Sequence, residues 1–96
     1  MTIFLKKFGA TLIGRESGKE AFAAFLPSLN GIKDNEKVEV DFKGVDVFSP
    51  SWGDEFLSPL LGKFSDRVIL KNTTNSSVET VIKFLEKIHK IKFNVE

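Results

Sequence analysis

Two serines and two carboxylates lie close together in the segment SPSWGDE, residues 49–55. An alternating apolar pattern precedes this segment, so these residues lie where a strand leads into a helix. A serine hydroxyl at such a position can accept a phosphoryl group, contact a partner protein, or cap the helix. Capping alone is worth about 1 kcal/mol, which is enough to explain Ser49 before Pro50 in the first turn. The same holds for Ser51, with Asp54 three residues later, so capping is favoured for both serines and remains compatible with docking or phosphorylation.

The charged and aromatic side chains nearby allow a structural and a functional interpretation. Asp54 and Glu55 complement the helix dipole, by about 0.3–1 kcal/mol each, and they can also form an acidic rim for a basic partner. Arg15 is predicted to be a structural anchor that grips one of these two carboxylates or that of Asp41. Trp52 fits either a core position or an interface anchor, because Trp is enriched at interaction hot spots.

The residue inventory argues against an enzyme. The chain has no Cys, which excludes disulfides, thiol catalysis and cysteine zinc sites. His89 is the only His and no Gly-x-Ser-x-Gly motif is present, so companions for a hydrolase triad or a metal site are missing. The stretch from Gly9 to Glu16 approaches the phosphate-loop pattern, yet Arg15 replaces the Lys and Glu16 the metal-binding hydroxyl. We predict a protein without catalytic activity, metal or cofactor of its own.

Charge and hydropathy narrow the class of partner. The 96 residues carry a formal charge of +1 with acids and bases interspersed, which disfavours nucleic acid and an anionic membrane surface. No apolar run approaches the roughly 18 residues that a membrane span needs. The N-terminal sequence MTIFLKK places its apolar residues before its lysines, the reverse of a signal peptide. We expect one cytoplasmic domain over residues 1–96.

The apolar patterns predict strands that alternate with helices. The expected strands are residues 2–6, 10–13, 38–42 continued by Val45 and Val47, 67–71, and a short strand or strap over 91–95. Helices are expected from Ser17 to Asn30, from Ser49 or Ser51 to Phe64, and from Ser76 to Ile88. Capping boxes, Ser17 with Glu20 and Ser76 with Glu79, mark the first and third helix starts. Pro59 lies deep in the second helix, where we expect a kink or a break.

This order predicts crossover connections and a mainly parallel sheet. Partners and ligands of such sheets gather outside the carboxyl ends of the strands. This edge depends on the strands over residues 38–42 and 67–71 being parallel neighbours. It then carries the following residues: Ser49, Pro50, Ser51, Asn72, Thr73, Thr74 and Asn75.

Two motifs carry a resemblance to a known family. The blocks FGATLIGRESGKE, residues 8–20, and VEVDFKGVDVFSPSWGDEF, residues 38–56, together with the Asn-rich loop before the last helix, resemble bacterial STAS-like domains of unknown function. The resemblance covers residues 8–88 and implies an α/β fold in which a small mixed, mainly parallel sheet of about four strands packs against three or four helices. That family is similar to the anti-sigma factor antagonists, in which a kinase phosphorylates the first Ser of an Asp-Ser-Ser-Gly turn. Pro50, which has no hydroxyl, stands at the acceptor position here, between Ser49 and Ser51.

We therefore predict a non-enzymatic docking module in a bacterial regulatory pathway. The predicted docking residues are Ser49, Ser51, Trp52, Asp54, Glu55, Thr73 and Asn75. The resemblance implies a partner similar to a histidine-kinase-type ATPase or an anti-sigma factor. Two alternatives remain open, which are a phosphorylation switch at Ser49 or Ser51 and a sensor of nucleotides or other small molecules at the hydroxyl-rich edge.

Overall fold

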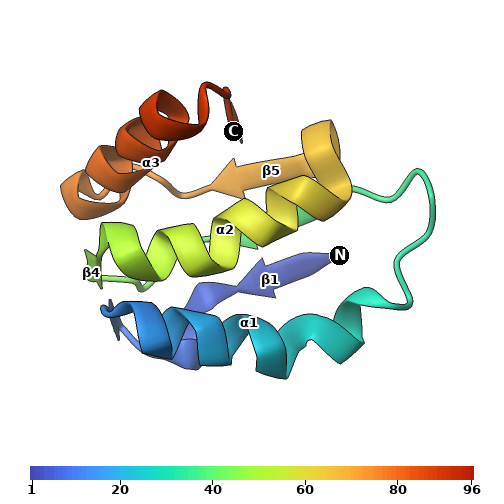
Figure 1. Ribbon diagram of the computed structural model, residues 1–96, viewed down its shortest axis with the longest axis horizontal. Coiled ribbons are helices and arrows are strands. Elements are labelled where there is room, and N and C mark those ends of the chain that lie inside the picture. The colour runs from blue at the N-terminus through green and yellow to red at the C-terminus, as the bar shows by residue number, and fades with distance from the viewer.

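A parallel sheet forms the base of the computed structural model, which describes residues 1–96 (Figure 1). Its strands lie in the order β1-β3-β5-β6, and every neighbouring pair is parallel. The four strands are β1 (Thr2–Phe4), β3 (Val38–Asp41), β5 (Val68–Lys71) and β6 (Asn94–Val95). Since β3 and β5 are parallel neighbours, the arrangement on which the predicted working edge depends is present. The predicted strap at the C-terminus is the short strand β6, paired with β5.

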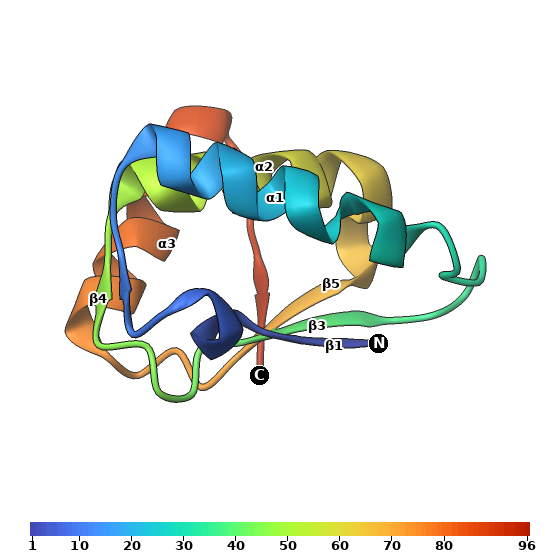
Figure 2. The ribbon, with the colours of Figure 1, turned by 90° about the horizontal axis from the view of Figure 1, so that it is seen from below.

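Three helices connect these strands. They are α1 (Arg15–Leu29), α2 (Pro50–Phe64) and α3 (Ser76–His89). Helices α1 and α2 lie side by side over one face of the sheet, and α3 packs against α2 (Figure 2). No helix is long and apolar enough to cross a lipid bilayer. The α/β class and the mainly parallel sheet predicted from the sequence are thus confirmed.

A second, two-stranded sheet lies at the carboxyl ends of β1 and β3. The 3₁₀ helix η1 (Leu5–Phe8) and a Gly turn separate it from the main sheet, and it pairs β2 (Thr11–Leu12) with β4 (Val47–Phe48) in parallel. Leu12 and Phe48 point into the core, while Thr11 and Val47 in the same two strands face outward. The chain enters α1 directly after β2 and α2 directly after β4, so both helices begin at this small sheet.

The sheet face opposite the helices carries polar side chains that pair across the strands. The Lys71 ammonium lies 3.1 Å from a Glu39 carboxylate oxygen and 3.3 Å from one of Glu96, and the Thr2 hydroxyl donates to Glu39 at 3.0 Å. Glu39 and then Glu96 raise the pKa of Lys71 above its ordinary value. These charges are thus matched within the domain.

Aromatic side chains form the centre of the core between the sheet and the helices. Trp52 and Phe56 stack with ring centroids 5.2 Å apart and an interplanar angle of 15°. Phe8 and Phe48 pack on the Trp52 indole from other elements, with centroids at 6.0 and 5.8 Å. The first turns of α2 are therefore held by the largest side chain of the chain, which is fully buried.

The helix boundaries depart from three sequence-based expectations. Helix α1 begins at Arg15, two residues before the predicted Ser17 box, because Gly14 (φ 90°) turns the chain and its carbonyl accepts from Gly18 at 3.2 Å. Helix α3 is capped by Asn75 and not by a Ser76 box. Helix α2 runs unbroken through Pro59, because buried side chains on both sides of the proline hold it against the core.

Two glycines allow the helices to approach closely. A Cβ on Gly18 of α1 would lie 2.7 Å from the Trp52 carbonyl oxygen of α2. A Cβ on Gly53 of α2 would lie 2.9 Å from a Val81 methyl group of α3 and 3.1 Å from the Phe48 ring. The starts of α1 and α2 are thus packed backbone to backbone, and α3 is packed against the same turn of α2.

Candidate functional site

Ser49 is the N-cap of α2, as the sequence predicts. Its Oγ accepts hydrogen bonds from the backbone N–H of Trp52 at 3.2 Å and of Gly14 at 3.3 Å. Pro50 occupies the first turn, where its missing N–H costs nothing. The Ser51 hydroxyl lies 3.3 Å from Ser49 Oγ. The Ser49 hydroxyl therefore ties the start of α2 to the end of β2.

Asn75 has a similar structural role at the start of α3. Its Oδ1 accepts from the N–H groups of Ser77 and Val78, at 2.8 and 3.2 Å, and its Nδ2 donates to the Asp46 carbonyl at 3.1 Å. Ser77 adds a contact that no sequence pattern indicates, because its hydroxyl donates to the Phe48 carbonyl at 3.0 Å and accepts from the Phe48 N–H at 2.9 Å. These bonds place the start of α3, with Asn75 and Ser77, beside β4 and the start of α2.

Arg15 is the anchor that the sequence predicts, and its partners are the two acids of α2. The guanidinium lies 3.0 Å from Glu55 Oε1 and 3.4 Å from Asp54 Oδ2. The hydrogen bonds that Arg15 donates to Glu55 and Asp54 raise the pKa of Arg15 above its ordinary value. The acidic rim is therefore paired in part with a cation of the same domain.

Asp54 also joins α2 to the end of α3. Its Oδ1 accepts from the Ser58 hydroxyl at 2.6 Å and lies 2.9 Å from His89 Nε2. The Ser58 hydroxyl, followed by His89 and Arg15, lowers the pKa of Asp54 below its ordinary value of 3.8. Sequence reasoning placed His89 at the end of the last helix but found neither of these partners, which are 31 and 35 residues away in the chain.

These three residues are not arranged as a hydrolase triad. In a triad the base contacts the serine and the carboxylate through different ring nitrogens. Here Ser58 and Asp54 both lie against Nε2, at 3.2 and 2.9 Å, and the serine donates its proton to the carboxylate. The imidazole is thus not placed to take that proton. No cluster of three His, Cys, Asp or Glu side chains suited to a metal ion occurs either.

Two of the predicted docking residues are buried, which corrects the sequence-based surface. Trp52 is fully buried in the aromatic core, so the interface-anchor interpretation is wrong and the core interpretation is right. Thr73 is only 8% exposed, because Asn72 (φ 57°) turns the chain after β5 and Thr73 then lies toward the interior. Both residues leave the candidate surface, while Ser51, Asp54, Glu55 and Asn75 remain partly exposed on it, and Ser49, also partly exposed, is engaged as the cap of α2.

Two apolar side chains that the sequence analysis did not select lie at the same edge. Ile13 is 55% exposed and Val47 is 44% exposed. Val47 was grouped with Val45 as an apolar pair, but only Val45 is buried, because the pairing of β4 with β2 turns Val47 outward. Ile13 lies next to Gly14, whose N–H donates to Ser49, so it is close to the start of α2. The edge therefore has an apolar component as well as a polar one.

The strands and helices form a small, mainly parallel α/β domain, which is consistent with a STAS-like fold. The family model described as a STAS-like domain of unknown function (DUF4325) matches residues 18–78. The chain belongs to this family. No curated protein and no solved structure matches the chain significantly.

Proposed function

We propose that this domain is a non-enzymatic regulatory module that binds another protein at the edge where β4 leads into α2. We call this surface the docking corner and define it by the exposed or partly exposed residues Ile13, Arg15, Val47, Ser51, Asp54, Glu55 and Asn75. The observation that carries the proposal is the exposure of two large aliphatic side chains, Ile13 and Val47, within this polar surrounding. Exposed apolar surface rimmed by polar groups is typical of protein interaction sites.

The contacts at the docking corner indicate how a partner would bind. Arg15 already pairs with both Asp54 and Glu55, so one positive charge of the domain offsets part of the acidic rim. Ile13 and Val47 offer apolar area that is removed from water on binding, which is worth about 25 cal/mol per Å². Replacing these two side chains should therefore weaken binding more than raising the salt concentration does.

The STAS resemblance suggests what the partner is. The resemblance implies a partner similar to a histidine-kinase-type ATPase or an anti-sigma factor, and we propose a partner of one of these two kinds for the docking corner. A regulatory role in the cytoplasm of a bacterium is part of the same proposal, and it rests on this analogy.

A binding assay with matched variants tests the docking corner. The double variant Ile13→Asp and Val47→Asp should weaken binding of a purified ATPase or anti-sigma partner by at least about tenfold, since two apolar contacts become charged. Leu26→Asp is the matched control, because Leu26 is also a partly exposed aliphatic residue, and it lies about 16 Å further along α1 than Arg15. Far-UV spectra should remain unchanged in both. Equal affinity of the double variant and the wild type would remove this surface from consideration.

A phosphorylation switch at Ser49 or Ser51, beside the same corner, is the second candidate. It is supported by the Ser51 hydroxyl, which is partly exposed and has Ser49 Oγ as its one hydrogen-bond contact. A phosphate on Ser51 would meet the positive end of the α2 dipole but also the acids of the next turn. Intact mass after incubation with cell extract and ATP decides this candidate, with Ser51→Ala as the control. An unmodified chain counts against the switch.

A further inference from the structure

Helix α3 exposes an apolar pair on the side that does not pack against the rest of the domain. In Figure 1, α3 lies at the edge of the helix layer, beyond α2. Phe84 and Ile88 are 46% and 49% exposed. Because they are four residues apart, they are neighbours on the surface of the helix. The buried face of α3 consists of other residues, namely Val78, Val81, Ile82 and Leu85.

The folding of α3 does not account for this apolar pair. Neither Phe84 nor Ile88 belongs to the hydrophobic core. Phenylalanine and isoleucine are also weaker helix formers than the lysine and glutamate at other exposed positions of α3. The other exposed large apolar side chains each lie on a different segment, so this is the one helix on which two of them adjoin. Exposed apolar surface beside polar groups is typical of interaction sites.

Three lysines form a row along α3 beside this pair. Lys83 and Lys87 lie one turn apart, and Lys90, the C-cap of the helix, continues the row three residues later. Lys87 also follows Phe84 by three residues, so the lysine row adjoins the apolar pair. All three lysines are exposed, and none of them takes part in an ion pair of the structure.

The acids of α3 do not pair with these lysines. Glu79 lies four residues before Lys83, and this spacing allows an ion pair. Glu86 stands in the same relation to Lys90. The structure forms neither pair, and the Glu86 carboxylate instead accepts the backbone N–H of Phe93 at 2.8 Å. The exposed side of α3 therefore combines unpaired positive charge with apolar surface.

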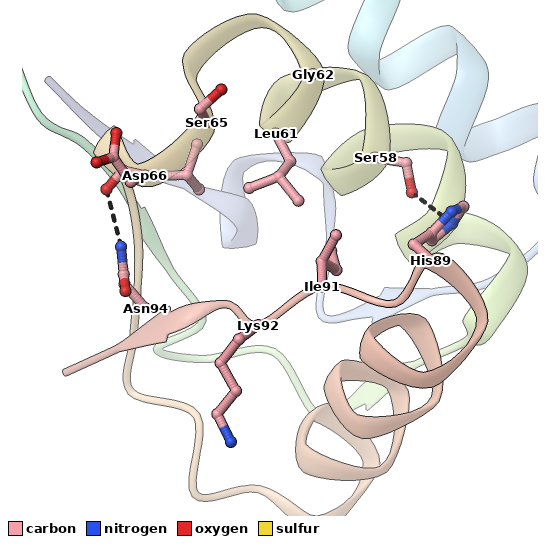
Figure 3. Close-up of a pocket in the computed structure, with 10 residues that line it drawn as sticks. Ser58, Leu61, Gly62, Ser65, Asp66, His89, Ile91, Lys92 and Asn94 are labelled. Carbon is pink, nitrogen blue, oxygen red and sulfur yellow. Dashed lines mark hydrogen bonds between the residues drawn. The ribbon is translucent and has the colours of Figure 1, made fainter.

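Contacts at its C-terminal end hold α3 in place. His89 Nε2 lies 3.2 Å from Ser58 Oγ of α2 (Figure 3) and 2.9 Å from Asp54 Oδ1. The bond from Phe93 to Glu86 ties the segment that follows the helix back to it. A partner would thus find this face of α3 already formed, which lowers the entropy that binding must cost.

We propose that this face of α3 binds an acidic amphipathic helix of another protein. The apolar side chains of the partner helix would lie against Phe84 and Ile88, and its Asp and Glu side chains would lie opposite the lysine row. This surface shares no residue with the docking corner, so each can fail without the other.

Charge selects this partner over two others. A second copy of the chain, paired through the same face about a two-fold axis, would bring the lysine rows of both copies together. An anionic lipid surface is typically bound by clusters of about four to eight basic residues, and the row has only Lys83, Lys87 and Lys90. An acidic helix complements both the three charges and the apolar pair.

An NMR titration of the isotope-labelled chain with two designed helical peptides tests the proposal. Both peptides have Leu at heptad positions a and d, and they carry either Glu or Lys at positions e and g. The acidic peptide should shift the backbone amide signals of residues 80–90 and bind at least about tenfold more tightly than the basic one, since only it complements the lysines. No shift with the acidic peptide, or equal binding of the two peptides, would overturn the proposal.

Sedimentation with phosphatidylglycerol vesicles checks the lipid alternative. The chain should stay in the supernatant at the concentrations at which it binds the acidic peptide. Binding to the vesicles without binding to the peptide would assign the lysine row to a lipid surface and contradict the proposal.

Charge-reversed variants connect binding to the lysine row. Lys83→Glu combined with Lys87→Glu should weaken binding of the acidic peptide at least about tenfold, because attraction becomes repulsion. Lys19→Glu combined with Lys63→Glu is the matched control. These two lysines are also exposed, helical and without an ion pair, and their reversal changes the net charge equally. Equal loss of affinity in both double variants would mean that net charge alone attracts the peptide, which would overturn the assignment to α3.

The apolar pair has its own variant. Phe84→Ser combined with Ile88→Ser should also weaken the acidic peptide at least about tenfold, while the fold is kept because both side chains lie outside the core. Leu26→Ser, at an exposed apolar residue of α1, should leave binding unchanged. Wild-type affinity of the Phe84 and Ile88 double variant would contradict the proposed helix contact.

Discussion

The two ends of α2 differ in how their polar groups are used. At the N-terminal end, Ser49 accepts two backbone N–H bonds, and Asp54 is bound by Ser58, His89 and Arg15. At the C-terminal end, Asp66 has no ion pair and Gly62 faces open space. The polar residues that the sequence patterns selected, such as Ser49 and Asp54, mostly form bonds that stabilise the fold. The residues without such contacts, Asp66 and Gly62, lie outside any sequence motif.

This difference has a physical basis. A cap, an ion pair or a close helix contact lowers the free energy of the folded state. Substitution at such a position should therefore lower the free energy of unfolding. An unpaired charge or a helical glycine in open space contributes little to folding, so substitution there should affect stability weakly or favourably. The two ends of α2 are therefore expected to respond to substitution in opposite ways.

Trp52→Ala at the N-terminal end should have the largest effect. Truncating a fully buried aromatic side chain costs about 3–5 kcal/mol of unfolding free energy, because apolar burial is lost and a cavity remains. Phe84→Ala on α3 is the control, since Phe84 is 46% exposed and its loss should cost far less. Urea denaturation of both variants measures the difference. Similar stabilities would show that Trp52 is not the core residue described above.

Gly18→Ala should have the next largest effect on stability, because it places a methyl group where α1 and α2 are in contact. The added Cβ would lie 2.7 Å from the Trp52 carbonyl oxygen and 2.9 Å from the Trp52 Cα, both of them backbone atoms. Forcing these helices apart should cost about 1–3 kcal/mol, which exceeds the gain in helix propensity. Chemical denaturation measures the change, and an increase in stability would contradict the close approach of α1 and α2.

The main sheet could be predicted from the sequence because its signals are local. The alternation of Val38, Val40 and Phe42 and the continuous run from Val68 to Leu70 define β3 and β5 without tertiary information. The cap at Ser49 was likewise predicted from its position before a proline. Local backbone chemistry was sufficient in each of these cases.

The rest of the candidate site depends on contacts between distant segments. Val47 looks like a buried strand residue until its pairing with Thr11 sets which way it faces. The contact of His89 with Ser58 and Asp54 exists only because α3 ends beside α2. Pro59 was expected to disturb α2, but the packing around it overrides the local preference. No local pattern in one sequence carries this information.

The contacts of Asp54 predict how the N-terminal end of α2 responds to pH. Because its pKa in the folded state lies below the ordinary value of 3.8, its charged form stabilises the fold above that pH. The contribution should disappear as the pH falls below about 4 and through the lower folded-state pKa. Asp54→Asn should thus cost at most about 1 kcal/mol near neutral pH, since solvent screens the pair. The wild type and the variant should converge in acid.

Stability curves of both proteins from pH 7 to pH 2, by chemical denaturation, measure this convergence. Glu36 and Glu39 also have lowered pKa values, from the N-terminal ammonium and from Lys71, but these groups are present in both proteins and cancel in the difference. A difference that stays constant across the acid range would mean that the carboxylate charge of Asp54 has no part in holding the helices together.

Gly62→Ala at the C-terminal end should have the smallest effect on folding and the opposite sign. With nothing within 4 Å of the new Cβ, the substitution meets no steric cost, and alanine is the better helix former by about 0.5–1 kcal/mol. The unfolding free energy should rise by about that amount. The same Gly→Ala change is thus expected to destabilise the fold at Gly18 and stabilise it at Gly62. A loss of stability at Gly62 would mean that the glycine is kept for the fold, and the contrast between the two ends of α2 would no longer hold.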